Sequence, residues 1–309
     1  MPPLACALVT AVAARYSNGV VGDAIYISVD LDSLRYHMRG YGLPEAGSNA
    51  VLERGLPRFL ELFAQLGVRA TFFVVAQDAP DNAGVLRRAV AAGHEIGSHS
   101  LTHPVPFHLA TSDAMEIELT QSRHLLEQVL GERVRGFRAP GMVMPAAVLD
   151  GVARAGYEYD SSLLPSPYVA ASLLVLRGYH RRRRDWLWPV CRAIFSSRLP
   201  HRLRQGLWEL PLSVSAVLRL PFFHTPTLLL GGFAAAMIAR VEARAGSYLH
   251  YAFHGIDLVA QDEVDAVLRG HPGVRLNLEE KTRLVERTLR ALLRRRESRR
   301  LDELTSTLR

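Results

Sequence analysis

The chain has 309 residues, of which 49% are hydrophobic and 22% are charged, a balance that is typical of a folded globular protein and argues against disorder. Its two cysteines, Cys6 and Cys191, are too few for a disulfide framework and lack the spacing of a metal site, which favours a reducing compartment. The net charge of +7 is concentrated locally, because residues 170–208 contain nine arginines and a single acid, Asp185.

Residues 1–22 are expected to form an N-terminal extension. Residues 3–14 are small and apolar, and Ala11-Val12-Ala13 resembles the cleavage site of a secretory signal, but no Lys or Arg precedes the run. We therefore expect a cytoplasmic protein, free or peripheral at the membrane, with export as the alternative. No uncharged run approaches the ~20 residues that a membrane-spanning helix needs.

Short apolar runs alternate with helical patterns over residues 24–160. The expected strands cover residues 24–29, 70–75, 94–98, 135–138 and 157–160, and the expected helices cover residues 52–66 and 112–130 and follow Asp81 and Pro145. Such alternation predicts a parallel sheet or barrel. We expect an α/β fold, an irregular (β/α) barrel of seven to eight strands.

The alternation of expected strands and helices stops after Pro165. Residues 166–206 are interpreted as an Arg/Trp-rich insertion, and strands are expected to resume at residues 207–214 and 248–254. A last helix is expected from Asn277, where Glu280 completes a capping box. The expected organisation is therefore an extension (1–22), one barrel carrying the insertion (23–276) and a C-terminal helix (277–309).

Polar side chains follow the expected strands at the points where these strands end. They are Asp30 and Asp32, His99 and His103, Arg138, Asp160, and His254. Because the carboxyl ends of parallel strands meet at one edge of a sheet, these residues are expected to lie together. Two histidines four residues apart with a nearby carboxylate are a ligand set for Zn²⁺ or a similar ion, with positions left open for water. This pattern indicates a metal-dependent hydrolase.

Four segments, taken in order, resemble the motifs of a known family. They are Ser28–Asp32, Gly97–Pro104, Arg138–Gly141 and Phe253–His254, and they resemble the polysaccharide deacetylases, which are also called the NodB-homology family or carbohydrate esterase family four. The resemblance covers residues 22–162 closely and residues 205–258 loosely. It implies a NodB-like distorted barrel that holds one divalent ion, usually zinc.

The resemblance also implies a role for individual residues. Asp32, His99 and His103 match the metal ligands, Asp30 the general base, and Arg138 the partner that positions this base. His254 matches the general acid, and the backbone N–H of Gly141 lies where the family places an oxyanion donor. Asp160 is expected near the substrate, or as a turn cap. Either Asp160 or Asp257 could keep His254 protonated, and His250 is a rival for the role of the acid because it shares the strand parity of His254.

Elementary chemistry supports these roles. An ion with three protein ligands can lower the pKa of a bound water towards ~7 and polarise an amide carbonyl. An arginine beside Asp30 would keep this carboxylate ionised and oriented. Cleavage of an amide also requires a proton for the departing amine, and a histidine can supply it near neutral pH.

Two departures from the family pattern leave the substrate open. Leu31 separates two aspartates that are adjacent in many members, a spacing also found in deformylases of lipid-linked aminoarabinose and in cyclic-imide or allantoin-type amidohydrolases, and Gly55–Leu60 is similar to that branch. The loop after Asp160 lacks the usual Asp-Trp element. We expect a hydrolase that removes an N-acetyl or N-formyl group from an amino sugar in a polysaccharide or lipid-linked glycan. The alternatives are an amidohydrolase of small cyclic amides and an inactive carbohydrate- or lipid-binding module.

The arginine-rich segment suggests a further partner. Arg181–Arg184 precede Trp186 and Trp188, and interleaved cationic and aromatic residues suit an anionic membrane interface. A solvated arginine face with tryptophans packed on the barrel is the alternative. No nucleic-acid partner is expected, because no recognition motif accompanies the charge.

Overall fold

The structure is a computed structural model that describes residues 23–40, 49–105, 107–142, 144, 146–167, 195–215, 217–230 and 248–308. Arg181–Arg184, Trp186 and Trp188 lie outside these residues, as does the expected extension. None of the helices within the described residues combines the length and the apolar character needed to cross a bilayer.

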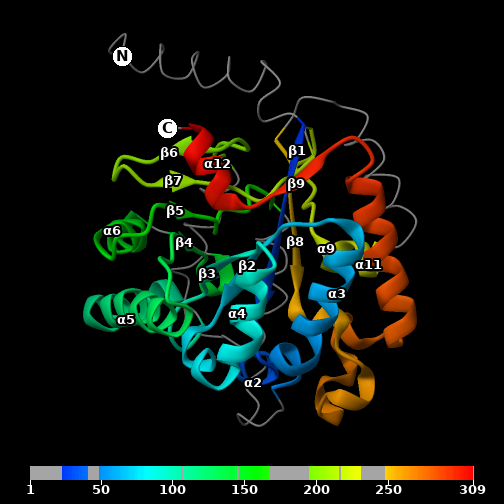
Figure 1. The fold of residues 1–309 in the computed structure, drawn as a ribbon. Helices are drawn as coiled ribbons and strands as arrows, with labels where there is room; N and C mark the ends of the chain where they lie inside the picture. The colour runs from blue at the N-terminus through cyan, green and yellow to red at the C-terminus, as the bar shows by residue number, and fades with distance from the viewer. Residues whose placement is uncertain are drawn as a thin grey trace.

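One curled sheet organises the chain (Figure 1). Its strands run in the order β6-β7-β5-β4-β3-β2-β1-β8, and β9 pairs with β1 off this path. All pairings are parallel except that of β6 with β7. The strands are β1 (Ala24–Leu31), β2 (Thr71–Val74), β3 (Glu95–Ser98), β4 (Gly136–Phe137), β5 (Tyr159–Asp160), β6 (His201–Arg202), β7 (Trp208–Glu209), β8 (His250–His254) and β9 (Glu297–Arg299).

Irregular backbone continues the sheet past β7 towards β8. Leu212 N donates to Leu163 O at 2.9 Å, and Ser213 N donates to His250 O at 3.2 Å. The two ends of the sheet path therefore approach each other, and the expectation of an irregular α/β barrel is confirmed, with eight strands on the path and β9 in addition.

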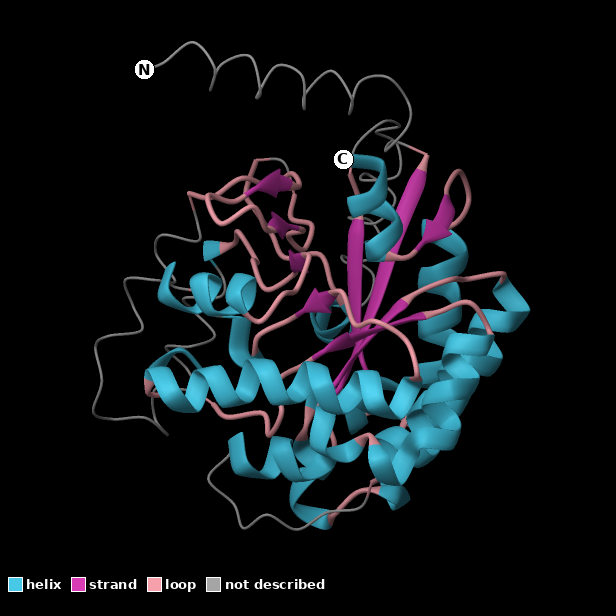
Figure 2. Cartoon of the chain, turned by 60° about the vertical axis from the view of Figure 1, so that its left-hand side comes forward, coloured by secondary structure: helices cyan, strands magenta, loops and turns pink. Residues whose placement is uncertain are grey.

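Helices cover the outside of the sheet, except that α12 lies across one end of it (Figures 1 and 2). They are α2 (Leu34–Gly40), α3 (Leu56–Leu66), α4 (Ala83–Ala91), α5 (Ser112–Leu130), α6 (Ala146–Arg154), α9 (His224–Leu230), α11 (Leu278–Leu292) and α12 (Leu301–Leu308). Helix α5 has the expected bounds, and Gly131 ends it in a left-handed conformation. The helix expected at residues 52–66 is divided into a π-helical turn, Val51–Gly55, and α3.

The sequence of strand β1 is almost uniformly apolar because the strand is buried. Alternate residues Ile25, Ile27, Val29 and Leu31 belong to the main hydrophobic core with residues of the outer helices. The intervening side chains, Tyr26, Ser28 and Asp30, point to the other face of the strand, the inside of the curled sheet. Polar groups at the even-numbered positions are thereby directed into the barrel.

The chain after α11 forms more than the single helix expected over residues 277–309. The capping box of Asn277 and Glu280 opens α11 as expected, but α11 ends at Leu292 and is followed by β9 and α12. Leu301, Leu304 and Leu308 of α12 pack in one buried cluster with Tyr26, Tyr159, Trp208 and other residues. Because β9 pairs with the first residues of β1, α12 closes the amino-terminal end of the barrel, away from α2 (Figure 1).

Candidate active site

Three potential metal ligands converge at the carboxyl ends of β1 and β3. Ligand atoms of Asp32, His99 and His103 all lie within 4.8 Å of one another. Asp32 Oδ1 is 3.1 Å from His99 Nε2 and 3.5 Å from His103 Nε2. The structure thus brings together the three residues that the spacing and the family resemblance singled out as ligands.

The two histidines are fixed by their surroundings. His99 Nδ1 lies 2.7 Å from the carbonyl oxygen of Arg138, so a proton on Nδ1 leaves Nε2 as the lone-pair atom that faces Asp32. The backbone of Ser100 and His103 is left-handed, with φ of 69° and 55°, and Ser100 Oγ accepts a hydrogen bond from His103 N at 3.0 Å. Left-handed non-glycine residues are uncommon and cluster at functional sites.

The electrostatics of this cluster are those of a cation site. Burial opposes ionisation of Asp32, but the facing His103 and His99 outweigh it and hold the pKa of Asp32 well below its usual range. Burial lowers the pKa of His103 to about 4, whereas burial of His99 is outweighed by the Asp32 carboxylate, which raises the pKa of His99. An anionic carboxylate between two imidazoles is the ligand set that a borderline ion such as Zn²⁺ prefers.

A divalent ion would fit these residues. Asp32 Oδ1 is buried without a hydrogen-bond partner within the part of the chain that the structure describes, and the same holds for His103 Nδ1. Buried polar atoms are normally satisfied, so Asp32 Oδ1, which faces two imidazole nitrogens, is an atom that an ion would satisfy.

A second carboxylate, Asp30, is held by Arg138. Arg138 Nη1 donates to Asp30 Oδ1 at 2.5 Å, and both side chains are buried. The remaining donors of Arg138 are also used: Nε and Nη2 donate to the carbonyl and hydroxyl oxygens of Ser161 at 2.8 and 2.9 Å, and the guanidinium stacks 4.2 Å from the ring centre of Phe73. This carboxylate is therefore fixed in orientation beside the cluster of ligands.

Ser28 and His250 complete the Arg138 network, a role that the motifs alone did not indicate. Ser28 Oγ accepts from Arg138 Nη1 at 3.0 Å and lies 2.9 Å from His250 Nε2. Burial and Arg138 together hold the pKa of His250 well below its usual range. His250 is thus a fully buried, neutral member of the barrel interior. The feature of the sequence that could have indicated Ser28 is its position two residues before Asp30 on β1, which places both side chains on the same face of the strand.

His254 lies directly beside Asp30. The two residues are register partners on the neighbouring parallel strands β8 and β1, and His254 is the less buried of the two. Asp257 Oδ2 accepts a hydrogen bond from His254 N at 2.9 Å, whereas Asp160 accepts from Ser162 N and Oγ. Asp257 thus contacts the backbone of His254, and its support of the His254 imidazole stays a prediction.

Asp160 and Gly141 occupy different surroundings. Asp160 is fully buried, and burial raises its pKa although a hydrogen bond with Glu209 opposes the rise. Gly141 is exposed, in the turn Pro140–Met142 that follows Arg138, with a φ of 73°. Space is open where a side chain of residue 141 would begin, so its backbone is accessible from solvent. Both assignments to substrate binding stay predictions.

Two polar residues of α5 face the end of β3 and the loop that carries the histidines. Neither residue was predicted from the sequence. Ser122 Oγ accepts from Ser98 Oγ at 3.0 Å, and Glu118 accepts from the loop at Leu101 and Thr102. Both residues are buried on the face of α5 that also buries Leu119. A charged residue on a mainly apolar helix face was the feature of the sequence that could have indicated Glu118.

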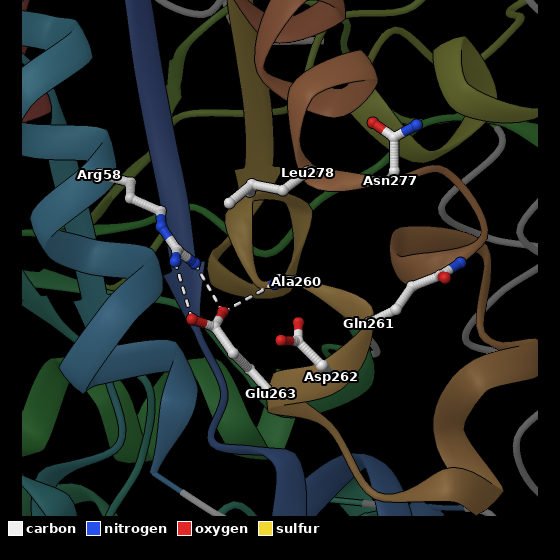
Figure 3. Close-up of a pocket in the computed structure, with 7 residues that line it drawn as sticks. All are labelled: Arg58, Ala260, Gln261, Asp262, Glu263, Asn277 and Leu278. Carbon is white, nitrogen blue, oxygen red and sulfur yellow. Dashed lines mark hydrogen bonds and ion pairs between the residues drawn. The ribbon is translucent and has the colours of Figure 1, made fainter.

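A surface pocket of about 520 Å³ lies apart from this site and contains none of its residues (Figure 3). A bidentate ion pair crosses it, with Arg58 Nη1 and Nη2 lying 2.6 and 2.7 Å from the carboxylate oxygens of Glu263. Arg58 also donates to Leu258 O at 2.9 Å. These contacts tie α3 to the chain that follows β8.

Comparison with known proteins confirms the resemblance that the motifs indicated. The family model described as polysaccharide deacetylase matches residues 45–159. A peptidoglycan deacetylase of Helicobacter pylori is 25% identical over 176 residues, which are 54% of this chain and 60% of that protein. A chitooligosaccharide deacetylase of Sinorhizobium fredii is 35% identical over 133 residues, 41% of this chain and 60% of that protein. The chain thus spans about 60% of the length of these relatives.

Solved structures show the same fold. A Mycobacterium smegmatis protein assigned to the polysaccharide deacetylases superposes with a TM-score of 0.60 at 19% identity, covering 92% of this chain and 89% of that one. The Puue allantoinase superposes with a TM-score of 0.57 at 16% identity, with the same coverage. The family match includes His99, His103 and Arg138, while Asp30, Asp32 and His254 lie outside the matched residues.

Proposed function

We propose that this protein, whose residues 45–159 match the polysaccharide deacetylase family model, is a metal-dependent hydrolase that removes an N-acyl group from an amino sugar of a glycan. The observation that carries the proposal is the cluster of Asp32, His99 and His103 beside the buried pair of Asp30 and Arg138. The relatives named as peptidoglycan and chitooligosaccharide deacetylases support an amino-sugar substrate and an acetyl group.

Each residue has a task in this reaction. Asp32, His99 and His103 would hold the ion, zinc by the chemistry of the donor set, and the ion would act as a Lewis acid that polarises the acyl carbonyl and lowers the pKa of water. Asp30 would take the proton of the attacking water, and Arg138 would keep its carboxylate oriented. The carbonyl carbon gains one oxygen from water and loses the amine.

The departing amine must gain a proton as the carbon–nitrogen bond breaks. His254 would donate this proton, because it lies beside Asp30 in the register of β1 and β8 and is partly open to solvent. The N–H of Gly141 would donate to the carbonyl oxygen as negative charge develops there. We assign the acid to His254 and not to His250, because His250 is fully buried and its nitrogens face Ser28 and Pro211.

A formyl group, a lipid-linked glycan and a small cyclic amide each remain compatible with the aspartate spacing of Asp30-Leu31-Asp32. The allantoinase likeness concerns the fold alone. An acetylated amino sugar is the substrate we propose, since the named activities of the sequence relatives agree with it.

The test combines metal analysis with a substrate panel. The metal-loaded protein is expected to release acetate from N-acetylglucosamine oligomers, while formylated aminosugars and allantoin serve as competing substrates. Asp30→Asn should lower the rate at least about 100-fold, the scale of general base catalysis, and retain metal, whereas the double variant His99→Ala, His103→Ala should lose metal and activity together. A stoichiometric ion in the double variant would refute the assigned ligands, and hydrolysis of allantoin alone would refute the substrate class.

In addition to a glycan substrate, we propose an anionic membrane surface as a partner that the protein contacts peripherally. Phe195, Val217 and Leu218 are 85%, 84% and 66% exposed, and Arg219 Nη1 donates to Ser196 O, which brings these two loops together. Exposed apolar side chains next to arginines suit an anionic lipid surface. Sedimentation with anionic vesicles should be reduced in the triple variant Phe195→Ser, Val217→Ser, Leu218→Ser, and absence of binding by the unchanged protein would overturn the contact.

A further inference from the structure

The backbone of the loop that joins the two histidine ligands is strained, although His103 N donates to Ser100 Oγ within the loop at 3.0 Å. Ser100 and His103 are both left-handed, with φ of 69° and 55°. For a residue with a side chain this conformation is sterically unfavourable, because Cβ lies too close to the following carbonyl oxygen. The loop therefore needs contacts from neighbouring elements to keep His103 facing Asp32 and His99.

The carbonyl oxygens of this loop are held by two elements: Arg39 Nη1 of α2 donates to Thr102 O at 2.8 Å, and the turn after β2 holds the other two. Ala76 N donates to Ser100 O at 3.0 Å, and Gln77 N donates to Leu101 O at 3.1 Å. Both donors belong to the 3₁₀ turn Ala76–Asp78 that follows β2. These bonds leave the amide groups of Leu101 and Thr102 to be satisfied from elsewhere.

Glu118 of α5 satisfies these amides. Its Oε2 accepts from Leu101 N at 2.8 Å and from Thr102 N at 2.9 Å, and its Oε1 accepts from Thr102 Oγ1 at 2.5 Å. The side chain is 8% exposed. Three donors on one sheltered carboxylate make strong, charge-assisted hydrogen bonds.

The helix that carries Glu118 is capped at both ends and contacts the preceding strand as well. Thr111 caps the first turn of α5 through Ala114 N, and Gly131 ends the helix. One turn after Glu118, Ser122 Oγ accepts from Ser98 Oγ, at the end of β3. Helix α5 thus contacts the chain immediately before His99 and again between His99 and His103.

We propose that Glu118 is a positioning residue that sets the affinity of the metal centre by holding the loop of Ser100–His103. This inference rests on the proposed metal site. Glu118 does not belong to the cluster of potential ligand atoms, so it acts through the backbone of Leu101 and Thr102. Its removal would leave three donors without an acceptor and free the loop to leave the left-handed conformation, which would separate His103 from the other two ligands.

The experiment measures binding of the metal alone. Protein stripped with a chelator is titrated with Zn²⁺ by calorimetry and with Co²⁺ by its visible absorption, and far-ultraviolet circular dichroism reports the fold. Glu118→Ala is expected to weaken affinity about 10- to 100-fold, the scale known for residues that orient metal ligands. Glu118→Gln should restore most of the affinity, because its amide oxygen can accept from both backbone amides while its NH₂ group faces Thr102 Oγ1.

Two further variants make the result interpretable. Glu116→Ala removes an exposed carboxylate from the same helix and should bind metal like the unchanged protein, which controls for charge. Thr102→Val removes only the hydroxyl that Glu118 Oε1 accepts from and should weaken binding less than Glu118→Ala. If Glu118→Ala does not fold, Thr102→Val and Glu118→Gln carry the test, since both retain the backbone contacts needed for folding.

The outcomes separate this inference from the proposed function. Weaker binding in Glu118→Ala or Thr102→Val, with Glu116→Ala unchanged, supports the positioning role. Equal affinity in all variants overturns that role and leaves the metal centre intact. Failure of the unchanged protein to bind one equivalent of metal overturns the metal centre, and the positioning role with it.

Discussion

At the scale of single residues, Arg138 shows how a buried charge is made tolerable. Its Nη1 binds Asp30 and Ser28, its Nε and Nη2 bind Ser161, and its plane lies on Phe73. A buried ion pair contributes little net stability, but breaking one costs several kcal/mol. The network is therefore better explained by orientation of the Asp30 carboxylate than by stability, since a lysine at position 138 could not make these planar, forked contacts.

A second buried acid, Glu95, has no part in the proposed reaction. Its oxygens accept from Tyr159 Oη at 2.8 Å, from Thr71 Oγ1 at 2.7 Å and from Asp302 N at 3.1 Å. Burial, together with the nearby Asp302, raises the pKa of Glu95 to about 8. The carboxyl group is thus protonated at neutral pH in the folded protein.

This raised pKa predicts a decline of stability with pH. In the unfolded chain the pKa of a glutamate is about 4.3, so the folded protein binds the extra proton between that value and about 8. The contribution of Glu95 is complete below the unfolded value and is lost as pH rises through the folded one, by up to about 1.4 kcal/mol per pH unit. Glu95→Gln, whose amide resembles the protonated carboxyl, should flatten this slope.

The measurement is the free energy of unfolding in urea between pH 6.5 and 8. This window lies above the range in which His94 acts in the opposite sense, because burial lowers the pKa of His94 to about 4 and its contribution is lost as pH falls below about 6.5. Parallel slopes for Glu95→Gln and the unchanged protein would show that Glu95 is ionised in the folded state.

At the scale of secondary-structure elements, α12 is a short helix with a large structural role. Leu301, Leu304 and Leu308 fill the amino-terminal end of the barrel against Tyr159 and Trp208. Leu304→Ala should lower the free energy of unfolding by about 2–5 kcal/mol, the range for truncating a fully buried leucine, as measured by urea denaturation.

The control for this helix is Thr307→Ala, at an exposed position of α12, where a change within about 0.5 kcal/mol is expected. The rate per folded molecule should not change in Leu304→Ala, because α12 closes the end of the barrel opposite to the carboxyl ends of β1 and β3. Equal effects of the two substitutions would mean that α12 does not pack as described.

The elements differ in how far their sequences predicted them. The bounds of α5 and the ends of the buried strands were predictable, because apolar periodicity and a following glycine or polar residue mark them locally. Strand β9 has the sequence Glu-Ser-Arg, without apolar alternation, and exists through pairing with β1. The contacts of Glu118 were not predictable either, since they join α5 to a loop with a left-handed backbone. A glycine would have indicated such a backbone, and the left-handed residues of this loop are not glycines.

At the scale of the whole molecule, the candidate site exists because distant segments share one end of a sheet. Asp30 and Asp32 come from the end of β1, His99 follows β3, Arg138 follows β4 and His254 ends β8. Parallel pairing aligns these ends, so a few polar residues separated by over 200 positions meet. The order of motifs was therefore a better guide to the site than any one motif, whereas the substrate depends on loops that sequence patterns do not fix.

This arrangement predicts that metal binding and global stability are coupled. An ion held by Asp32, His99 and His103 binds the folded chain and finds no such cluster in the unfolded one, so at a free Zn²⁺ concentration 100 times the dissociation constant it should add about 2.7 kcal/mol to the free energy of unfolding. The double variant His99→Ala, His103→Ala should gain nothing from the same addition. Urea denaturation with and without Zn²⁺ measures both, and an equal gain in the double variant would place the stabilising ion elsewhere on the protein.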